Sequence, residues 1–274
     1  MMRNIRVVFA VLSLSVVLVA GVADELQAQE KRQGWTKRLR YRRELRRELQ
    51  GEIQLSGAFA LYPMAVKWAE EFRKIHPKVR IDISAGGAGK GITDALAKVV
   101  DLGMVSRDIY PQELEKGAFP IAVVKDAVVP TINSNNPLID QILATGLKQQ
   151  VAQDLWIHTT ARTWGDVLGT GSTIPVHVYT RSDACGAAET FAAWLGAKQE
   201  DLEGTAVFGD PGVTSVVQRD KVGIGFNNIA YAYDINSKKP YRHIAVIPLD
   251  LNGNGKIDPE EDFYATSTEL NAAI

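Results

Sequence analysis

The chain has 274 residues, 46% of them hydrophobic, so it is long enough to bury a core in one large domain or two smaller ones. Its formal net charge of -1 excludes a strongly basic field that would recruit nucleic acid or an acidic membrane. A single cysteine, Cys185, excludes an internal disulfide.

Residues 1–28 have the pattern of an export signal. Two arginines supply a basic start, and residues 7–20 form an apolar run of the length expected for a signal peptide. Small residues suited to cleavage follow at 21–23 and 26–28. An uncleaved membrane anchor is the alternative, which the shortness of the apolar run disfavours. We therefore expect export to the periplasm or the extracellular space.

Residues 29–50 form a basic arm that precedes the folded part. Arg43 and Arg47 alternate with Glu44 and Glu48 at a spacing that suits a solvated helix. A flexible, solvated arm is the favoured interpretation, and docking to a membrane surface or a partner is the alternative. The pattern assigns this segment no function.

Residues 51–130 alternate strand-like and helix-like runs, which predicts a first α/β lobe with a parallel sheet and helices on its faces. The proline at 77 ends the first helix, because the residue before a proline disfavours the α region. Strands are expected at 52–55, 79–84, 102–105, 121–124 and 127–132, and helices at 63–75 and 92–99.

Residues 131–240 predict a second α/β lobe, and residues 241–274 a return segment. Helices are expected at 138–149, 163–168, 188–195 and 213–219, and strands at 175–179 and 222–226. In the return segment, a strand is expected at 244–249 and a helix at 268–274.

Three glycine-bearing turns, at 56–63, 85–92 and 181–187, each stand between a strand-like run and a helix-like run. Such a turn leaves backbone N–H groups exposed at a helix N-terminus, where the helix dipole favours negative charge. The third turn begins with Arg181. Two facing lobes would place all three turns around one crevice, so the sequence predicts an anion cleft.

These turns and the segments around them resemble the exported phosphate-binding proteins that feed ABC transporters, from about Gly51 to the C-terminus. Six stretches match in order. They are Gly57 with Tyr62-Pro63 and Lys67-Trp68-Ala69, Gly86-Gly87-Ala88-Gly89-Lys90-Gly91-Ile92, Val100-Asp101-Leu102-Gly103 with Ser106-Arg107, Asn133 with Asn136-Pro137 and Thr163-Trp164-Gly165-Asp166-Val167-Leu168-Gly169, Arg181-Ser182-Asp183 with Gly186 and Glu189-Thr190-Phe191, and Val222-Gly223-Ile224-Gly225-Phe226.

The resemblance implies a type II periplasmic-binding-protein-like fold, α/β and two-lobed, with a ligand cleft between the lobes. It implies a monomer that is not an enzyme, that captures phosphate or a related oxyanion, and that delivers it to an ABC transporter permease, with no nucleic acid as partner. The implied anion-binding residues are Ala60, Leu61, Tyr62, Ala88, Gly89, Lys90, Ser106, Arg107, Arg181, Cys185, Gly186 and Ala187.

The chain departs from the family pattern at the hydroxyl ligands. Ala88, Cys185 and Ala187 stand where serine or threonine is expected, and Arg107 stands where some members place an aspartate that accepts a phosphate proton. A hydrogen bond to a charged group contributes about 1.5–3 kcal/mol, so three losses could weaken binding by about 10³-fold. Three outcomes stay open: weak phosphate binding, a different or larger anion, or a degenerate site.

Cys185 lies before a helix and near an arginine, where a thiol can have a lowered pKa and act as a nucleophile. No histidine accompanies it in its motif, so a near-isosteric replacement of serine is the favoured interpretation. Phosphoryl transfer and hydrolysis likewise find no histidine or carboxylate constellation beside the three turns.

Residues 250–261 fit the twelve-residue calcium loop of an EF-hand, with oxygen ligands at the required positions and glycine at the sixth. No entering helix is expected, so we predict a single structural Ca²⁺ site. An acidic turn that happens to match is the alternative. The predicted ligands are Asp250, Asn252, Asn254, Lys256 through its carbonyl, Asp258 and Glu261.

The resemblance also predicts a further strand and helix that would return to the first lobe after residue 274. We expect these returning elements to be missing and the first sheet to present an unpaired edge. A second hypothesis is therefore a calcium-stabilised extracellular binding or structural protein that keeps the scaffold with a degenerate anion site.

Overall fold

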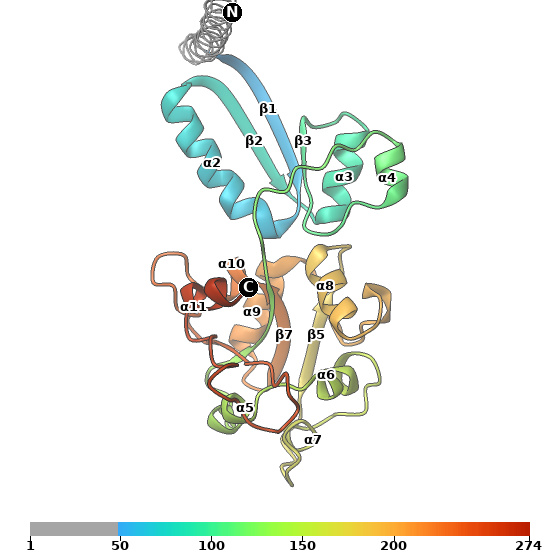
Figure 1. The fold of residues 1–274 in the computed structure, drawn as a ribbon, viewed down its shortest axis with the longest axis vertical. Coiled ribbons are helices and arrows are strands. Elements are labelled where there is room, and N and C mark those ends of the chain that lie inside the picture. The colour runs from blue at the N-terminus through green and yellow to red at the C-terminus, as the bar shows by residue number, and fades with distance from the viewer. Residues whose placement is uncertain (1–48) are drawn as a thin grey trace, which may run out of the picture. The chain divides into compact units, whose positions relative to one another are not determined.

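The computed structural model describes residues 49–274, so the predicted export signal and most of the basic arm lie outside the described residues. Two β-sheets organise the described chain (Figure 1). The first part contains β1 (Gln50–Gly57), η1 (Phe59–Leu61), α2 (Tyr62–Ile75), β2 (Lys78–Ala85), α3 (Ala88–Leu96), β3 (Leu102–Met104) and α4 (Pro111–Glu115).

The second part follows an extended crossover. It contains β4 (Val128–Asn133), α5 (Ile139–Thr145), α6 (Gln149–Trp156), α7 (Trp164–Leu168), β5 (His177–Arg181), α8 (Gly186–Trp194), η2 (Gln199–Asp201), β6 (Thr205–Val207), α9 (Gly209–Arg219), β7 (Gly223–Asn228), α10 (Ile229–Ala232), β8 (Ile244–Val246) and α11 (Ser267–Ala273).

The first sheet has three strands in the order β2-β1-β3, and β1 runs parallel to β3. The apolar residues of α2 recur at helical spacing, so Ala65 and Ala69, four residues apart, lie on one face, and both are buried. The buried core of this lobe consists mainly of small side chains, among them Ala58 and Ala88. Helices and strands can therefore approach one another closely.

Two glycines permit the closest of these approaches, between α3 and the β1–β3 pair. A Cβ atom on Gly91 would lie 2.4 Å from the carbonyl oxygen of Met104. Gly57 has a positive φ of 132°, and its Cβ would lie 2.1 Å from the same oxygen. The glycines thus bring the N-terminus of α3 to the carboxyl end of β1.

The second sheet is mixed, with five strands in the order β6-β5-β7-β4-β8. Strand β5 runs parallel to β6 and β7, whereas β4 runs antiparallel to β7 and β8. Its core gathers around Trp156, Phe191 and Phe226. The Phe191 and Phe226 rings stack with centroids 4.4 Å apart, and Trp156 meets Phe191 edge-on at 4.9 Å.

The structure confirms the two-lobed α/β class and corrects three expected elements. Residues 121–124 form no strand; Ile121 and Val123 are 69% and 51% exposed. The expected helix at 138–149 is two helices, because Gly146 has a φ of 73° and ends α5. Helix α3 begins at Ala88 rather than at Ile92, inside the glycine-bearing turn.

None of the helices described in residues 49–274 combines the length and the apolar composition needed to span a bilayer.

Candidate anion-binding site

The structure brings the three predicted turns together. The N–H groups of Gly86 and Gly87 donate to the Gly57 carbonyl at 2.9 and 3.2 Å, which fixes the second turn on the first. The N–H of Gly89, in the first turn of α3, donates to the Ala184 carbonyl of the third turn at 3.4 Å. The site is thus assembled from backbone groups at the ends of β1, β2 and β5.

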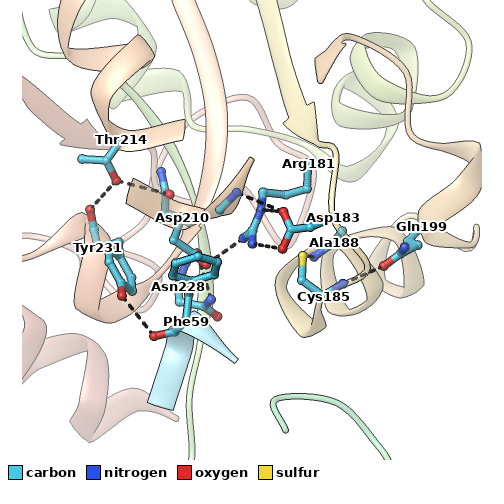
Figure 2. Close-up of polar contacts among 12 residues, drawn as sticks. Phe59, Arg181, Asp183, Cys185, Ala188, Gln199, Asp210, Thr214, Asn228 and Tyr231 are labelled. Atoms are coloured by element: carbon cyan, nitrogen blue, oxygen red, sulfur yellow. Dashed lines mark hydrogen bonds and ion pairs between the residues drawn. The ribbon is translucent and has the colours of Figure 1, made fainter. Parts of the chain in front are cut away.

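Two further contacts join the parts of the chain on either side of the crossover. Gly186, the first residue of α8, approaches Ser106 so closely that a Cβ would lie 1.8 Å from its carbonyl oxygen. The Tyr231 hydroxyl donates to the Phe59 carbonyl at 3.1 Å (Figure 2). Within the second part, the Thr214 hydroxyl holds Tyr231 by donating to its carbonyl at 2.9 Å.

The residues that replace the expected hydroxyl-bearing side chains are buried. Ala88 and Ala187 are fully buried, each with 0% exposure. Cys185 is the N-cap of α8, and its sulfur accepts the Ala188 N–H at 3.5 Å. Ala60, Leu61, Tyr62 and Gly89 keep partial exposure, while Gly186 is buried.

Arg181 is fixed by two carboxylates (Figure 2). Its Nε and Nη2 donate to the two oxygens of Asp183 at 2.9 and 2.7 Å, a bidentate pair. Its Nη1 donates to Asp210 at 2.7 Å. The Arg181 side chain is 0% exposed, and its guanidinium carbon lies 5.9 Å from the centre of the Phe59 ring.

Asp210 and its partner Asn228 are site residues that the sequence analysis missed. Asp210 lies in the first turn of α9 and is 1% exposed. Its Oδ1 accepts the backbone N–H and the side-chain amide of Asn228 at 3.0 and 2.8 Å. The signal was a fourth small-residue turn, Gly209-Asp210-Pro211-Gly212, with proline in the first turn of a helix.

Burial and pairing shift the pKa values of this cluster in defined directions. Burial acts to lower the pKa of Arg181, but hydrogen bonding to Asp183 and the charge of Asp210 outweigh it, so the pKa is raised. Burial raises the pKa of the Cys185 thiol to about 12, despite the nearby guanidinium. Cys185 is therefore a neutral thiol near pH 7, not an activated thiolate.

The other two predicted cations are also paired. Arg107 donates from Nη1 and Nη2 to Glu113 at 3.0 and 2.7 Å, and its Nε lies 3.7 Å from Glu189. Lys90 bonds to Asp94, which also accepts the Ser56 hydroxyl at 2.7 Å. Around Lys90, Arg107 and Arg181, five carboxylates thus face three cations, and the paired groups have a formal net charge of -2.

The predicted calcium loop folds around two buried acidic residues, Asp250 and Glu261, which are 4% and 5% exposed. Asp250 accepts three backbone N–H groups, those of residues 253, 254 and 255, at 2.7, 3.2 and 2.8 Å. Glu261 accepts those of residues 251, 252 and 258 at 2.7, 3.1 and 3.2 Å.

The remaining predicted ligands lie on the exposed side of the loop. The side-chain amides of Asn252 and Asn254 donate to Asp258 at 3.0 and 2.7 Å, and the Lys256 ammonium also contacts this carboxylate. Across residues 49–274, no three His, Cys, Asp or Glu side chains already converge in a metal-holding arrangement.

A family model described as a PBP superfamily domain matches residues 43–270. Solved neighbours include a putative phosphate ABC transporter substrate-binding protein with bound phosphate from Clostridium perfringens, at 25% identity and a TM-score of 0.62, covering 74% of this chain and 76% of the other. An ABC-type phosphate transport receptor from Vibrio cholerae, at 19% identity and a TM-score of 0.51, covers 72% and 76% and supports the fold.

The chain is also similar to curated proteins, among them one named as a phosphate-binding protein. Protein SphX of Synechococcus elongatus is 28% identical over 211 residues, covering 74% of this chain and 60% of the relative. The phosphate-binding protein PstS of Xylella fastidiosa is 28% identical over 205 residues, covering 66% and 54%. The chain therefore matches less than two thirds of the length of these two relatives.

Proposed function

The chain belongs to the family of PBP superfamily domains, and on this premise we propose that it is an exported solute-binding protein that captures phosphate or a related oxyanion for an ABC transporter. The observation that carries the proposal is the meeting of three glycine-bearing turns, two of them at the N-termini of α3 and α8, beside the buried Arg181. The names of the relatives and of the phosphate-bound neighbour support the same ligand class.

We propose binding rather than catalysis, by a monomer that hands its ligand to a transporter permease. The neutral thiol of Cys185 supports this choice, because burial raises its pKa even though it lies at a helix N-terminus, where a thiol could otherwise be activated. Backbone N–H groups at the helix N-termini are the donors that suit an oxyanion. With alanine and cysteine at the hydroxyl positions, we expect weak phosphate binding.

We also propose that residues 250–261 bind one structural Ca²⁺ ion. The donor set of carboxylate and amide oxygens suits a hard cation, and the loop already turns around Asp250 and Glu261 at its two ends. Each carboxylate has about four lone-pair sites, so Asp250 and Glu261 could ligate the ion while keeping some of their backbone hydrogen bonds. Such a site would hold the segment between β8 and α11 in place.

The test is titration calorimetry of the protein with phosphate, sulfate, arsenate and molybdate. We expect heat of binding with phosphate or another of these oxyanions, and its loss in Arg181→Ala. Arg219→Ala is the matched control, because Arg219 bonds within its own exposed helix surface. Arg181→Lys keeps the charge but loses the fork geometry, so it separates a folding defect from a binding defect. No heat with any oxyanion would refute the proposal.

A further inference from the structure

Resting on the proposed function, we infer that Asp210 makes the site selective for singly charged oxyanions, so that phosphate is taken in its dihydrogen form. Asp210 comes from α9 and Asp183 from the turn before α8, and both bond to the one guanidinium of Arg181. With one cation and two carboxylates, this buried cluster has a formal net charge of -1. An arginine paired only with Asp183 would leave the cluster neutral.

The charge of Arg181 is cancelled inside a buried cluster. A guanidinium has five N–H donors, and three of them donate to carboxylate oxygens here. The two that remain are buried with the rest of the side chain, which is 0% exposed, so the cluster acts on a nearby anion through its charge. Such an anion meets no unpaired positive charge, and each further negative charge on it is repelled.

Asp210 is held firmly in place by its hydrogen bonds. One of its oxygens accepts two hydrogen bonds from Asn228, and the other accepts the guanidinium of Arg181. Its side chain is 1% exposed, so solvent and salt screen it little. It is thus a positioning and charge-setting residue that acts through Arg181, not a group that must contact the ligand.

Three other ionisable groups near Asp210 could contribute to a pH dependence, namely Cys185, Tyr231 and Asp126. Cys185 on α8 and Tyr231 on α10 are neutral near pH 7, because burial raises the pKa of each. On the crossover, desolvation raises the pKa of the Asp126 carboxyl to about 6. Asp126 would also favour anions at low pH, so its contribution must be removed separately.

The decisive experiment titrates inorganic phosphate and sulfate into the wild-type protein and three variants at constant ionic strength, on both sides of the second ionisation of phosphate. For the wild type we expect phosphate affinity to fall as pH rises and sulfate, doubly charged throughout, to bind more weakly. Asp210→Asn should bind the two dianions, hydrogen phosphate and sulfate, more tightly by about tenfold or more. Removing one negative charge within about 10 Å of the ligand weakens the repulsion by at least this factor at an effective dielectric constant of about 20.

Two matched variants complete the design. Asp220→Asn removes a hydrogen-bonded carboxylate from the other end of α9 and should behave like the wild type. Asp126→Asn should keep the fall in phosphate affinity with pH. If Asp210→Asn does not fold, the comparison of phosphate with sulfate in the wild type still decides.

The possible outcomes separate this inference from the proposed function. Phosphate affinity that does not fall with pH, equal affinity for sulfate at acid pH, an unchanged profile in a folded Asp210→Asn, or loss of the pH dependence in Asp126→Asn would overturn the inference alone. Absence of binding by every oxyanion in the wild type would overturn the proposed function, and the inference with it.

Discussion

Cys185 lies at the point where a side-chain donor to the anion is expected, and its sulfur instead accepts the Ala188 N–H at 3.5 Å. Sulfur is a weak hydrogen-bond acceptor and a thiol a weak donor. Ala187, two residues on, offers no polar atom at all. At the scale of single residues, the weak phosphate binding that we propose would therefore originate in the side chains at positions 185 and 187.

Restoring one hydroxyl should strengthen the site. We expect Cys185→Ser to tighten phosphate binding by roughly tenfold, because a hydrogen bond to a charged group contributes about 1.5–3 kcal/mol. Serine is also a preferred N-cap, so the melting temperature should not fall. Calorimetry and thermal melting measure both effects.

Cys185→Ala is the matched control for this change. It removes the sulfur without adding a donor, so phosphate affinity should stay near that of the wild type. Equal affinities for the serine and alanine variants would show that position 185 does not reach the ligand.

The sequence could not have revealed how the charges at the site are paired. Arg181 was found from its motif, but Asp210 is 29 positions away and meets it only because β5 and α9 lie together. Pairing across elements of this kind leaves no periodic pattern in the chain. Only the small-residue turn around Asp210 marked the position as unusual.

The approach of α3 to β1 and β3 shapes the site at the scale of elements. Gly57 and Gly91 allow it, and they deliver the N-terminus of α3 to the neighbourhood of Ala184. The alternating pattern of β1 and the helical pattern of α2 made these elements predictable, because each has one buried face. The prediction of a strand at 121–124 was wrong, because these residues pair with no strand of the described chain.

Gly91→Ala should destabilise the protein although alanine is the better helix former. Helix propensity favours alanine by about 1 kcal/mol, whereas overpacking costs about 1–3 kcal/mol or more. The clash should dominate, because the neighbouring atom, 2.4 Å away, is a backbone oxygen that cannot rotate aside. Urea unfolding measures the difference in free energy.

Gly171→Ala is the control for the same chemical change, since no atom lies within 4 Å of its Cβ and its φ is not positive. We expect it to be neutral or slightly stabilising, because alanine restricts the unfolded chain. If both variants unfolded at the same urea concentration, the close approach of α3 would carry no energetic weight.

At the scale of the whole molecule, a structural calcium ion would act on stability rather than on ligand choice. The loop at 250–261 lies between β8 and α11, and its backbone already turns around Asp250 and Glu261. The side-chain spacing was readable from the sequence. The affinity for the ion depends on how the carboxylates of Asp250 and Glu261 divide their lone pairs between backbone N–H groups and the ion, which the spacing of residues alone does not decide.

Calcium should raise the melting temperature, and EDTA should lower it. Free calcium at about ten times its dissociation constant adds about 1.4 kcal/mol, which corresponds to roughly 2–4 °C for a chain of this size. Asp250→Asn should abolish the shift, whereas Asp234→Asn, in another turn where an aspartate accepts backbone N–H groups, should retain it. An unchanged melting temperature at millimolar calcium would contradict the site.

The two sheets draw on separate continuous stretches, residues 50–104 and 128–246, and this bears on the order in which the molecule assembles. Pairings within one stretch close shorter loops than pairings between stretches, so they form earlier during folding. Arg181, Asp183, Asp210 and Asn228 all belong to the second stretch. We therefore expect Arg181 to pair with its carboxylates when the second sheet folds, before the N-terminus of α3 packs against this part of the chain.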